Sequence, residues 1–431
     1  MRILSADWVV PVEGAPIREG AVAIADDGRL AAVGTSAELG EGERYPDAVI
    51  LPGFVNAHSH LEYAVYAGFG DGLSFGPWIA LHVERKQRLD VDAMEAIARL
   101  GALECLRSGI TTVGDCSFGG AAATACAELG LGAIVYLEVF GEDERALDRF
   151  HRIHERVADA FSERVRLGIS PHAPYTCTVD VYRASAELGL PVATHLAESE
   201  AETEFLRTGS GSWRDFAELL VPPPVTTGIR MLAEAGLLGP HVLAAHCVQA
   251  DAEEIELLAA NDVAVAHCPR SNALLGCGIA PLAALRDAGI RVCIATDSPA
   301  STPSFDMFDE LRGAIAAARA RERRPDALTA EDAIELATLG GARALGIADE
   351  TGSLVAGKRA DLTVLSLADT PFLPWEDPVT ATVLGGSPER VVATLVSGTT
   401  RYEKGGKAWH ELIGAAHSAR ARLLSHGDPT S

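Results

Sequence analysis

The feature that most constrains the fold of this chain is a series of eight short apolar runs. Segments rich in alanine, leucine, glutamate and arginine separate them, a composition typical of helices. Apolar strands that alternate with helices indicate parallel βαβ units, and eight such units are the number that closes a parallel sheet into a barrel. We therefore predict an α/β chain with a (β/α)8 TIM-type barrel. The runs cover residues 51–57, 110–114, 133–139, 165–169, 192–194, 242–245, 263–266 and 292–295.

Ionisable side chains follow most of these runs at the same point, where the expected strand ends. Such barrels build their active sites at the C-terminal ends of the strands, so these side chains are expected to meet in one site. The set comprises His58, His60, Asp115, His172, His195, His246, His267 and Asp297.

Four of these residues make a candidate metal site. His58 and His60 lie at positions i and i+2 of an extended segment, so their imidazoles point to the same side. His195 and Asp297 join them from other strand ends. Three neutral imidazoles and a carboxylate suit one divalent ion, with zinc as the first choice and iron as the alternative. Such a site leaves a position for water, whose pKa the ion lowers towards about 7.

The two ends of the chain differ from its middle. Short β-like runs with turn signals fill the first fifty residues and return after residue 352, without helical periodicity. We predict a small β-sandwich domain assembled from residues 1–52 and 352–406, beside a catalytic barrel of residues 53–351. Residues 407–431 are expected to form a short helix and a frayed polar tail.

Charge and cysteine usage limit the partners of the protein. The 431-residue chain carries a formal net charge of −24, which argues against nucleic acid and anionic membranes. No run reaches the ~18 consecutive apolar residues of a membrane helix, and Asp7 stands where a secretory signal would be apolar. The eight cysteines form no CxxC pair and are expected to be reduced and buried. We expect a cytoplasmic protein that acts on a small molecule.

Five short motifs occur in order along the chain. Residues 52–60 read PGFVNAHSH, residues 194–198 read THLAE and residues 267–272 read HCPRSN. The sequence ATDS follows at 295–298 and GKRADL at 357–362. This series resembles the PGxxNxHxH, HxxE, HCPxSN, TDS and GKxADL motifs of the amidohydrolase superfamily, in its deaminase and chlorohydrolase branch. The resemblance covers nearly the whole chain and implies the same barrel.

The resemblance also implies a role for each matching residue. The residues that would bind one metal ion are His58, His60, His195 and Asp297. Asp297 would in addition accept a proton from the bound water, and Glu198 would carry it to a ring nitrogen of the substrate. His246 would hydrogen-bond the nucleophile or the developing tetrahedral centre. Deamination of an aromatic amine needs a nucleophile, an acid that protonates the ring and a route for the proton to the leaving ammonia. A homodimer is the default assembly that the family suggests.

The reaction we expect is hydrolytic deamination of an amino-substituted heterocycle with release of ammonia. The HxxE motif favours the deaminases over the cyclic-amide hydrolases of the same superfamily. Two-metal members often carry a carboxylated lysine after the fourth strand, and Lys86, Lys358, Lys404 and Lys407 all lie elsewhere, so a single metal is expected. Two alternatives remain open. One is a hydrolase that displaces another leaving group such as chloride, and the other is a barrel retained as a binding protein.

The residues after the HxH motif suggest a substrate. Residues 58–63 read HSHLEY, which resembles the HxHLEF/Y stretch of aminodeoxyfutalosine deaminases. These enzymes act on 6-amino-6-deoxyfutalosine, an adenosine-like nucleoside of menaquinone biosynthesis. Glu62 would then contact the substrate or orient a metal-ligating histidine, while Trp78 would stack on the base and His172 would contact the sugar or ring edge. S-adenosylhomocysteine, methylthioadenosine, pterins and cytosine are the alternative substrates.

Overall fold

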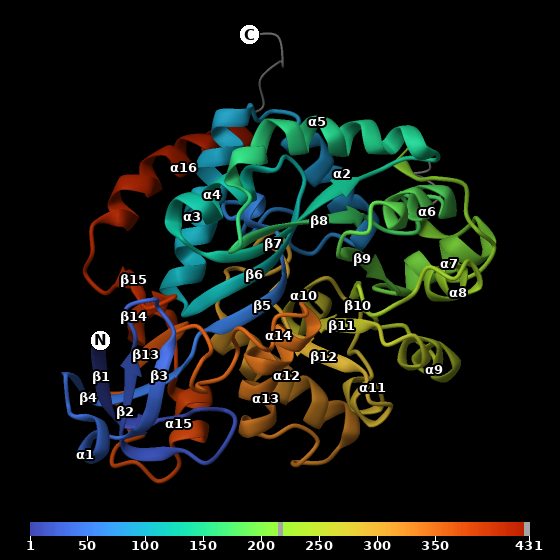
Figure 1. Cartoon of the computed structure of the whole chain (residues 1–431). Coiled ribbons are helices and arrows are strands. Elements are labelled where there is room, and N and C mark those ends of the chain that lie inside the picture. The colour runs from blue at the N-terminus through green and yellow to red at the C-terminus, as the bar shows by residue number, and fades with distance from the viewer. Residues whose placement is uncertain (214–218, 426–431) are drawn as a thin grey trace.

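Eight parallel strands form the barrel that the sequence predicts. In the computed structural model, which describes residues 1–213 and 219–425, they pair with their neighbours in chain order from β5 to β12 (Figure 1). Each predicted run overlaps one strand of this barrel, which confirms it. The strands are β5 (Phe54–Ser59), β6 (Ile110–Ser117), β7 (Gly132–Val139), β8 (Val165–Pro171), β9 (Val192–Leu196), β10 (Val242–His246), β11 (Ala264–His267) and β12 (Arg291–Ile294).

The barrel closes between β5 and the segment that follows β12. A parallel bridge pairs Ser59 with Asp297, and the Asp297 N–H donates to the His58 carbonyl at 3.0 Å. The Asn56 side chain completes this seam, because it donates to Thr296 Oγ1 at 2.7 Å and accepts from the Thr296 N–H at 2.9 Å. The seam joins the segments that carry His58 and Asp297, so closure of the barrel brings these two side chains together.

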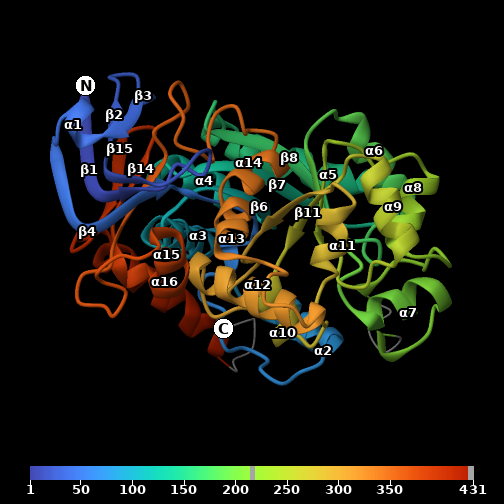
Figure 2. The same cartoon turned by 90° about the horizontal axis from the view of Figure 1, so that it is seen from below.

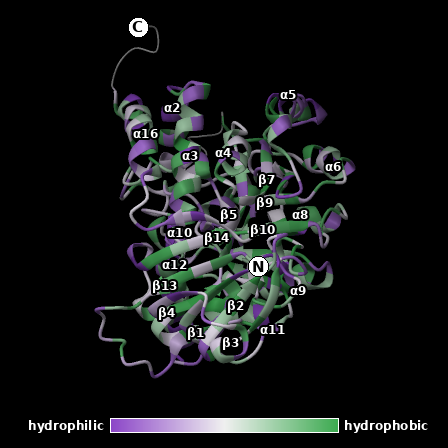
Figure 3. Cartoon of the chain, turned by 60° about the vertical axis from the view of Figure 1, so that its left-hand side comes forward, coloured by the Kyte–Doolittle hydropathy of each residue, from purple (hydrophilic) through white to green (hydrophobic). Residues whose placement is uncertain are grey.

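Helices surround the barrel and bury their apolar faces against it (Figure 2). In α5, for example, Phe150, Ile153 and Val157 are buried, while the charged residues of the same helix face outward and appear purple in Figure 3. The helices of this region are α2 (Phe75–Lys86), α3 (Val91–Arg107), α4 (Ala121–Leu129), α5 (Leu147–Val157), α6 (Val179–Glu187), α7 (Glu200–Thr208), α8 (Gly228–Glu234), α9 (Ala252–Ala260), α10 (Pro269–Leu274), α11 (Leu282–Asp287), α12 (Met307–Glu322), α13 (Ala330–Ala337) and α14 (Leu339–Ala344).

Both ends of the chain contribute to a second, mixed sheet. Its order is β15-β14-β13-β4-β1-β2-β3, with β1 and β4 parallel and the other pairs antiparallel. The seven strands are hydrogen-bonded in this single order, where the sequence pattern suggested a sandwich. The strands are β1 (Arg2–Val9), β2 (Ile17–Ile24), β3 (Leu30–Thr35), β4 (Glu43–Pro52), β13 (Leu362–Ser366), β14 (Val391–Val396) and β15 (Thr399–Glu403), with α1 (Ser36–Leu39) and α15 (Pro378–Gly385) beside them.

The first predicted run is wrong at its start, because it spans two sheets. Leu51 and Pro52 end β4 of the mixed sheet, and the barrel strand β5 begins at Phe54. Gly53 lies between them, packed so closely on β6 that a Cβ there would lie 2.1 Å from Thr111 Cγ2. The apolar run continues because both sheets bury it, and only the glycine marks the change.

The C-terminal segment forms a longer helix than the sequence suggested. α16 (Ala408–Leu424) packs on α3, and Arg420 donates to the carbonyls of Val65 and Ala67. It therefore holds the chain that leads from β5 to α2. The predicted frayed tail lies outside the described residues. None of the described helices combines the length and the apolar character needed to cross a bilayer.

Candidate active site

The four predicted metal ligands converge on one point inside the mouth of the barrel. Asp297 Oδ1 lies 3.6 Å from His58 Nε2 and 3.5 Å from His60 Nε2. His195 Nε2 lies 3.4 Å from His60 Nε2, with the two rings stacked. These atoms belong to three overlapping groups able to hold an ion, of which His58, His60 and Asp297 form one and His58, His195 and His246 another.

The chemistry of these atoms fits a divalent ion. His58 Nε2 is buried and has no hydrogen-bond partner within the described part of the chain, although it faces the Asp297 carboxylate. Burial lowers the pKa of His60 and of His195 to about 3, so both imidazoles are neutral near pH 7 and offer lone pairs. Burial raises the pKa of Asp297, but the close contact with the His58 imidazole and the other nearby histidines outweighs it and holds the pKa well below its usual range. The cluster therefore pairs neutral nitrogens with one ionised carboxylate.

Hydrogen bonds from neighbouring strands fix the orientation of these side chains. The His172 carbonyl accepts from His195 Nδ1 at 2.7 Å, which leaves His195 Nε2 free to face the cluster. Asp297 Oδ2 accepts from Ser271 at 2.6 Å and from Ser301 at 3.1 Å, so Oδ1 is the oxygen left for an ion.

Asp115 supports the HxH segment rather than the ion. Its Oδ2 accepts from Ser59 Oγ at 2.9 Å and from the Leu61 N–H at 2.7 Å, on either side of His60. Asp115 thus anchors the backbone on either side of His60.

Three residues around the cluster adopt left-handed backbone conformations that non-glycine residues rarely occupy. The φ angles are 75° at His246, 61° at Asp297 and 51° at Ala197. Such conformations cost about 1–3 kcal/mol each and concentrate where function needs a defined geometry. Each of them follows a barrel strand or ends one, at the same level as the histidines.

Glu198 and His246 face each other beside the cluster. Glu198 Oε2 lies 3.7 Å from His246 Nε2, and His246 Nδ1 lies 3.0 Å from Asn272 Oδ1. Burial, followed by the negative charges of Asp297 and Glu202, raises the pKa of Glu198 well above its ordinary value. This environment favours the neutral carboxyl form of Glu198, the form that can donate a hydrogen bond.

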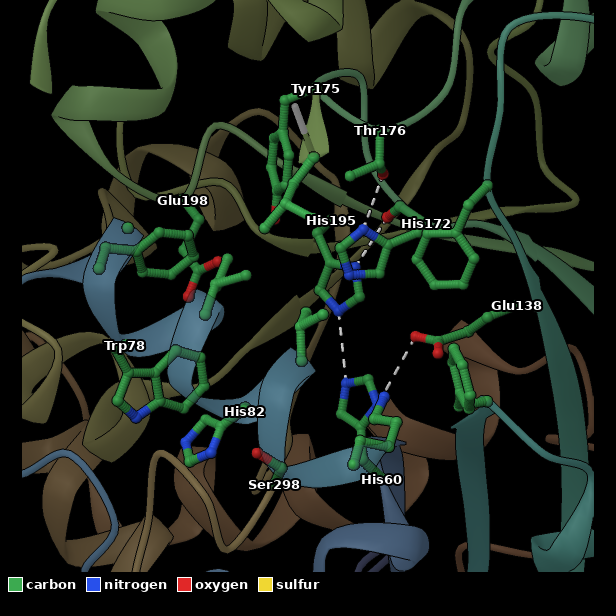
Figure 4. Close-up of a pocket in the computed structure, with 18 of the residues that line it drawn as sticks. His60, Trp78, His82, Glu138, His172, Tyr175, Thr176, His195, Glu198 and Ser298 are labelled. Carbon is green, nitrogen blue, oxygen red and sulfur yellow. Dashed lines mark hydrogen bonds and ion pairs between the residues drawn. The ribbon is translucent and has the colours of Figure 1, made fainter. Parts of the chain in front are cut away.

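The backbone of Glu198 is itself fixed. The Glu202 carboxylate accepts from the Glu198 N–H at 2.7 Å and caps α7 together with Ser199. The motif at 195–198 thus ends in a tight turn that points the Glu198 side chain into the barrel mouth (Figure 4).

A cavity of about 380 Å³ lies over the cluster and has mainly apolar walls. Trp78, His172 and Glu198, three of the predicted substrate contacts, line it (Figure 4). Aromatic and aliphatic side chains supply most of the remaining wall, and α2 covers it. These lining residues are Tyr63, Phe75, Ile79, Val83, Phe118, Phe140, Tyr175, Trp213, Leu219, Leu220 and Leu275. The cavity suits a flat heterocycle with an apolar substituent.

The predicted substrate contact of Glu62 does not agree with the structure. Glu62 lies in the 3-10 turn η1 (Leu61–Tyr63), away from the cavity wall, and its carboxylate accepts from Ser117 Oγ and from the Gly119 and Ala121 N–H groups. The alternative, contact with a metal-ligating histidine, is not seen either among the described residues. The extended conformation that would have turned Glu62 to the cavity ends at His60.

We therefore expect Glu62→Ala to lower stability without changing substrate affinity. Three buried acceptor bonds at the start of α4 would be lost, which costs about 2–4 kcal/mol in the free energy of unfolding. Thermal unfolding and steady-state kinetics test this, with Glu62→Gln as a milder variant that keeps one acceptor. A rise in KM of tenfold or more without loss of stability would restore Glu62 as a substrate contact.

Three further residues of the cavity wall were not singled out as site residues from the sequence. Glu138, in β7, lies 3.9 Å from His60 Nδ1, and Lys86 and His82 reach the cavity from α2. Glu138 could have been found from the sequence, because it is a lone charged residue in an apolar run, one position before the end of its strand. The sequence does not indicate that Lys86 and His82 face the cavity, since charged residues on a helix most often face solvent.

An eight-stranded barrel with three histidines and an aspartate at its strand ends is the arrangement of a metal-dependent hydrolase. Residues 49–401 match the model of the amidohydrolase family. The chain belongs to this family.

Relatives of known sequence and structure agree with this assignment. A 5′-deoxyadenosine deaminase of Methanothermobacter thermautotrophicus is 33% identical over 396 residues, 89% of each chain. A 5-methylthioadenosine/S-adenosylhomocysteine deaminase of Moorella thermoacetica is 34% identical over 412 residues, 92% of this chain and 93% of the relative. The crystal structure of an adenosine deaminase from Xanthomonas campestris with bound zinc superimposes with a TM-score of 0.87, at 27% identity and 98% coverage of both chains.

Proposed function

We propose that this protein is a mononuclear, metal-dependent deaminase of an adenine nucleoside that is altered at its 5′ carbon. One observation carries the proposal: the buried carboxyl of Glu198 stands beside the cluster of three histidines and an aspartate, on the wall of an apolar cavity. The reaction replaces the ring amino group by the oxygen of water and releases ammonia. The names of the two curated relatives, which are 33% and 34% identical, support an adenine nucleoside as the substrate.

The metal ligands we propose are His58, His60, His195 and Asp297. A divalent ion at this site, zinc first and iron second, would supply a Lewis acid that lowers the pKa of a water molecule. A zinc-bound structure superimposes on this chain, which supports zinc. Asp297 would accept the proton of the attacking water, because its carboxylate is ionised and faces the cluster.

Glu198 would donate a proton to a ring nitrogen next to the carbon under attack, which breaks the aromaticity of the ring. His246 would hydrogen-bond the attacking oxygen, since its Nε2 points at the same space as Glu198 Oε2. The proton that Asp297 takes up would then leave with the amino group as ammonia, and Glu198 would take back the hydroxyl proton as the carbonyl forms. Trp78 would cover the base and His172 the sugar, as both line the cavity beside these groups.

The substrates that we would test first are 6-amino-6-deoxyfutalosine, 5′-deoxyadenosine, methylthioadenosine and S-adenosylhomocysteine. The all-buried, free cysteines support a reducing compartment, and we place the enzyme in the cytoplasm.

Ammonia release from metal-loaded protein tests the function. The panel contains these four nucleosides, adenosine, a pterin and cytosine, with a chlorotriazine assayed for chloride as the control for the other leaving group. We expect ammonia from at least one nucleoside, and discrimination of up to ~10⁴-fold among them, because buried polar groups reject analogues that leave them unpaired. Turnover of the triazine or of cytosine alone would contradict the proposal.

A further inference from the structure

The C-terminal helix α16 binds the chain on either side of α2, the helix that covers the cavity. Before α2, the Arg420 guanidinium donates to two backbone carbonyls within residues 65–67. After α2, the Arg88 guanidinium donates to the carbonyls of Leu423 at 3.1 Å and Ser425 at 2.7 Å, at the C-terminal end of α16. A cation is favoured there, because the last carbonyls of a helix have no partner within the helix. One helix therefore binds the chain at both ends of α2.

The segment that leads into α2 cannot fix the helix by itself. Gly68 and Gly72 have left-handed backbone angles, with φ of 82° and 78°. No described atom lies within 4 Å of the position that a Cβ would occupy at either glycine. Glycine has more backbone freedom than any other residue, so a segment with these two positions is easily displaced. We attribute the position of α2 to contacts outside this segment.

Phe69 joins α16 to α2. The guanidinium carbon of Arg420, on α16, lies 4.4 Å from the ring centroid of Phe69. That of Arg85, on α2, lies 4.0 Å from the same centroid. The electron-rich face of an aromatic ring attracts a guanidinium group, so one ring contacts both helices through their arginines.

A series of aromatic side chains connects Phe69 to the cavity wall. Tyr66 is fully buried, and its ring centroid lies 5.8 Å from that of Phe69 and 5.6 Å from that of His82. The ring of His82 lies 4.4 Å from that of Trp78, and both residues line the cavity (Figure 4). The contact between α16 and the start of this series therefore bears on the wall that faces the substrate.

The groups that would carry out the reaction are anchored independently of α16. Asp115 accepts hydrogen bonds from the residues on either side of His60, and Glu202 fixes the backbone of Glu198. Within residues 1–213 and 219–425, none that belongs to α16 lines the cavity. Loss of the contacts of α16 is therefore expected to alter the cavity wall and to leave the histidine cluster in place.

We propose that Arg420 and Arg88 are positioning residues through which α16 holds α2 over the cavity. They fix the part of the wall that α2 supplies, with Trp78 and Ile79, and so raise the affinity for the substrate without a part in the chemical step. The kinetic side of the proposal rests on the deaminase function above, whereas the hold on α2 can be measured without a substrate.

Two measurements on Arg420→Met test the proposal. Amide hydrogen exchange within residues 68–87 should become about tenfold faster or more, because the contacts that hold a segment set the free energy of its local opening. KM should rise by about 10- to 100-fold, the factor that corresponds to loss of a hydrogen bond to a charged group. We expect kcat to stay within about threefold, since loss of uniform binding changes KM alone. The metal content should equal that of the wild type.

Two further variants separate the hydrogen bonds from the charge. Arg88→Met should produce the same pattern as Arg420→Met, because it releases the other end of α2. Arg420→Lys should recover part of both effects, since it keeps a cation beside Phe69 but lacks the planar fork that reaches two carbonyls.

Arg18→Met is the matched control, since Arg18 is exposed on β2 of the mixed sheet. It should leave exchange and KM unchanged. Unchanged exchange in a folded Arg420→Met would overturn the proposal, and so would faster exchange with an unaltered KM. A fall in kcat with loss of metal would also overturn it, because Arg420 would then support the cluster. Failure of the wild type on every adenine nucleoside would instead refute the deaminase function, and exchange alone would then decide whether α16 holds α2.

Discussion

Replacement of His195 by alanine is expected to remove the metal ion and the activity together. His195 Nε2 faces the cluster because the His172 carbonyl accepts from its Nδ1. Wild-type protein should contain about one equivalent of divalent metal per chain and the variant close to none. Turnover should fall by ~10³-fold or more, since a bound ion contributes several kcal/mol to the stabilisation of the transition state.

His267→Ala is the matched control for this variant. His267 is buried at the end of β11, at the level of the other histidines, but among residues 1–213 and 219–425 it belongs to none of the groups able to hold an ion. Its loss should lower stability and leave the metal content near one equivalent. Elemental analysis and unfolding with and without added zinc distinguish the two variants, because a ligand stabilises only a protein that binds it. Two tightly bound ions in the wild type, or full activity of metal-free protein, would refute the mononuclear site.

Much of the barrel could be predicted because strands that are buried on both faces read as continuous apolar runs. The run at 133–139 and the strand Gly132–Val139 differ by one residue. The prediction failed at residues 51–52, where one apolar run serves two sheets in succession. Sequence periodicity reports burial and not which sheet provides it, so the change of sheet could not be seen.

The cluster of His58, His60, His195 and Asp297 could be predicted because each is an ionisable residue at or just after the end of an apolar strand. Glu62 was misplaced since its partners, the N–H groups of Gly119 and Ala121, lie far along the chain and only the folded barrel brings them near. Lys86 and His82 face the cavity because α2 packs over the barrel mouth with that face inward. Nothing in the helical pattern says which of its faces covers a substrate.

Replacement of Glu198 by glutamine is expected to separate chemistry from metal binding. The amide keeps the size of the side chain but has no acidic proton to give to a ring nitrogen. We expect kcat to fall by ~10²-fold or more, the scale of a general acid or base contribution, with the metal content unchanged. Because Glu198 acts in the transition state, kcat and kcat/KM should fall by similar factors and KM should change little.

The matched control for Glu198→Gln is Glu200→Gln. Glu200 is exposed at the start of α7, so Glu200→Gln should behave as the wild type in every assay. Metal analysis of both variants shows whether a loss of turnover comes from the proton donor or from the ion. We expect a large effect because burial raises the pKa of Glu198, which favours the neutral carboxyl beside His246. Normal turnover by a metal-loaded Glu198→Gln would mean that a different group protonates the ring.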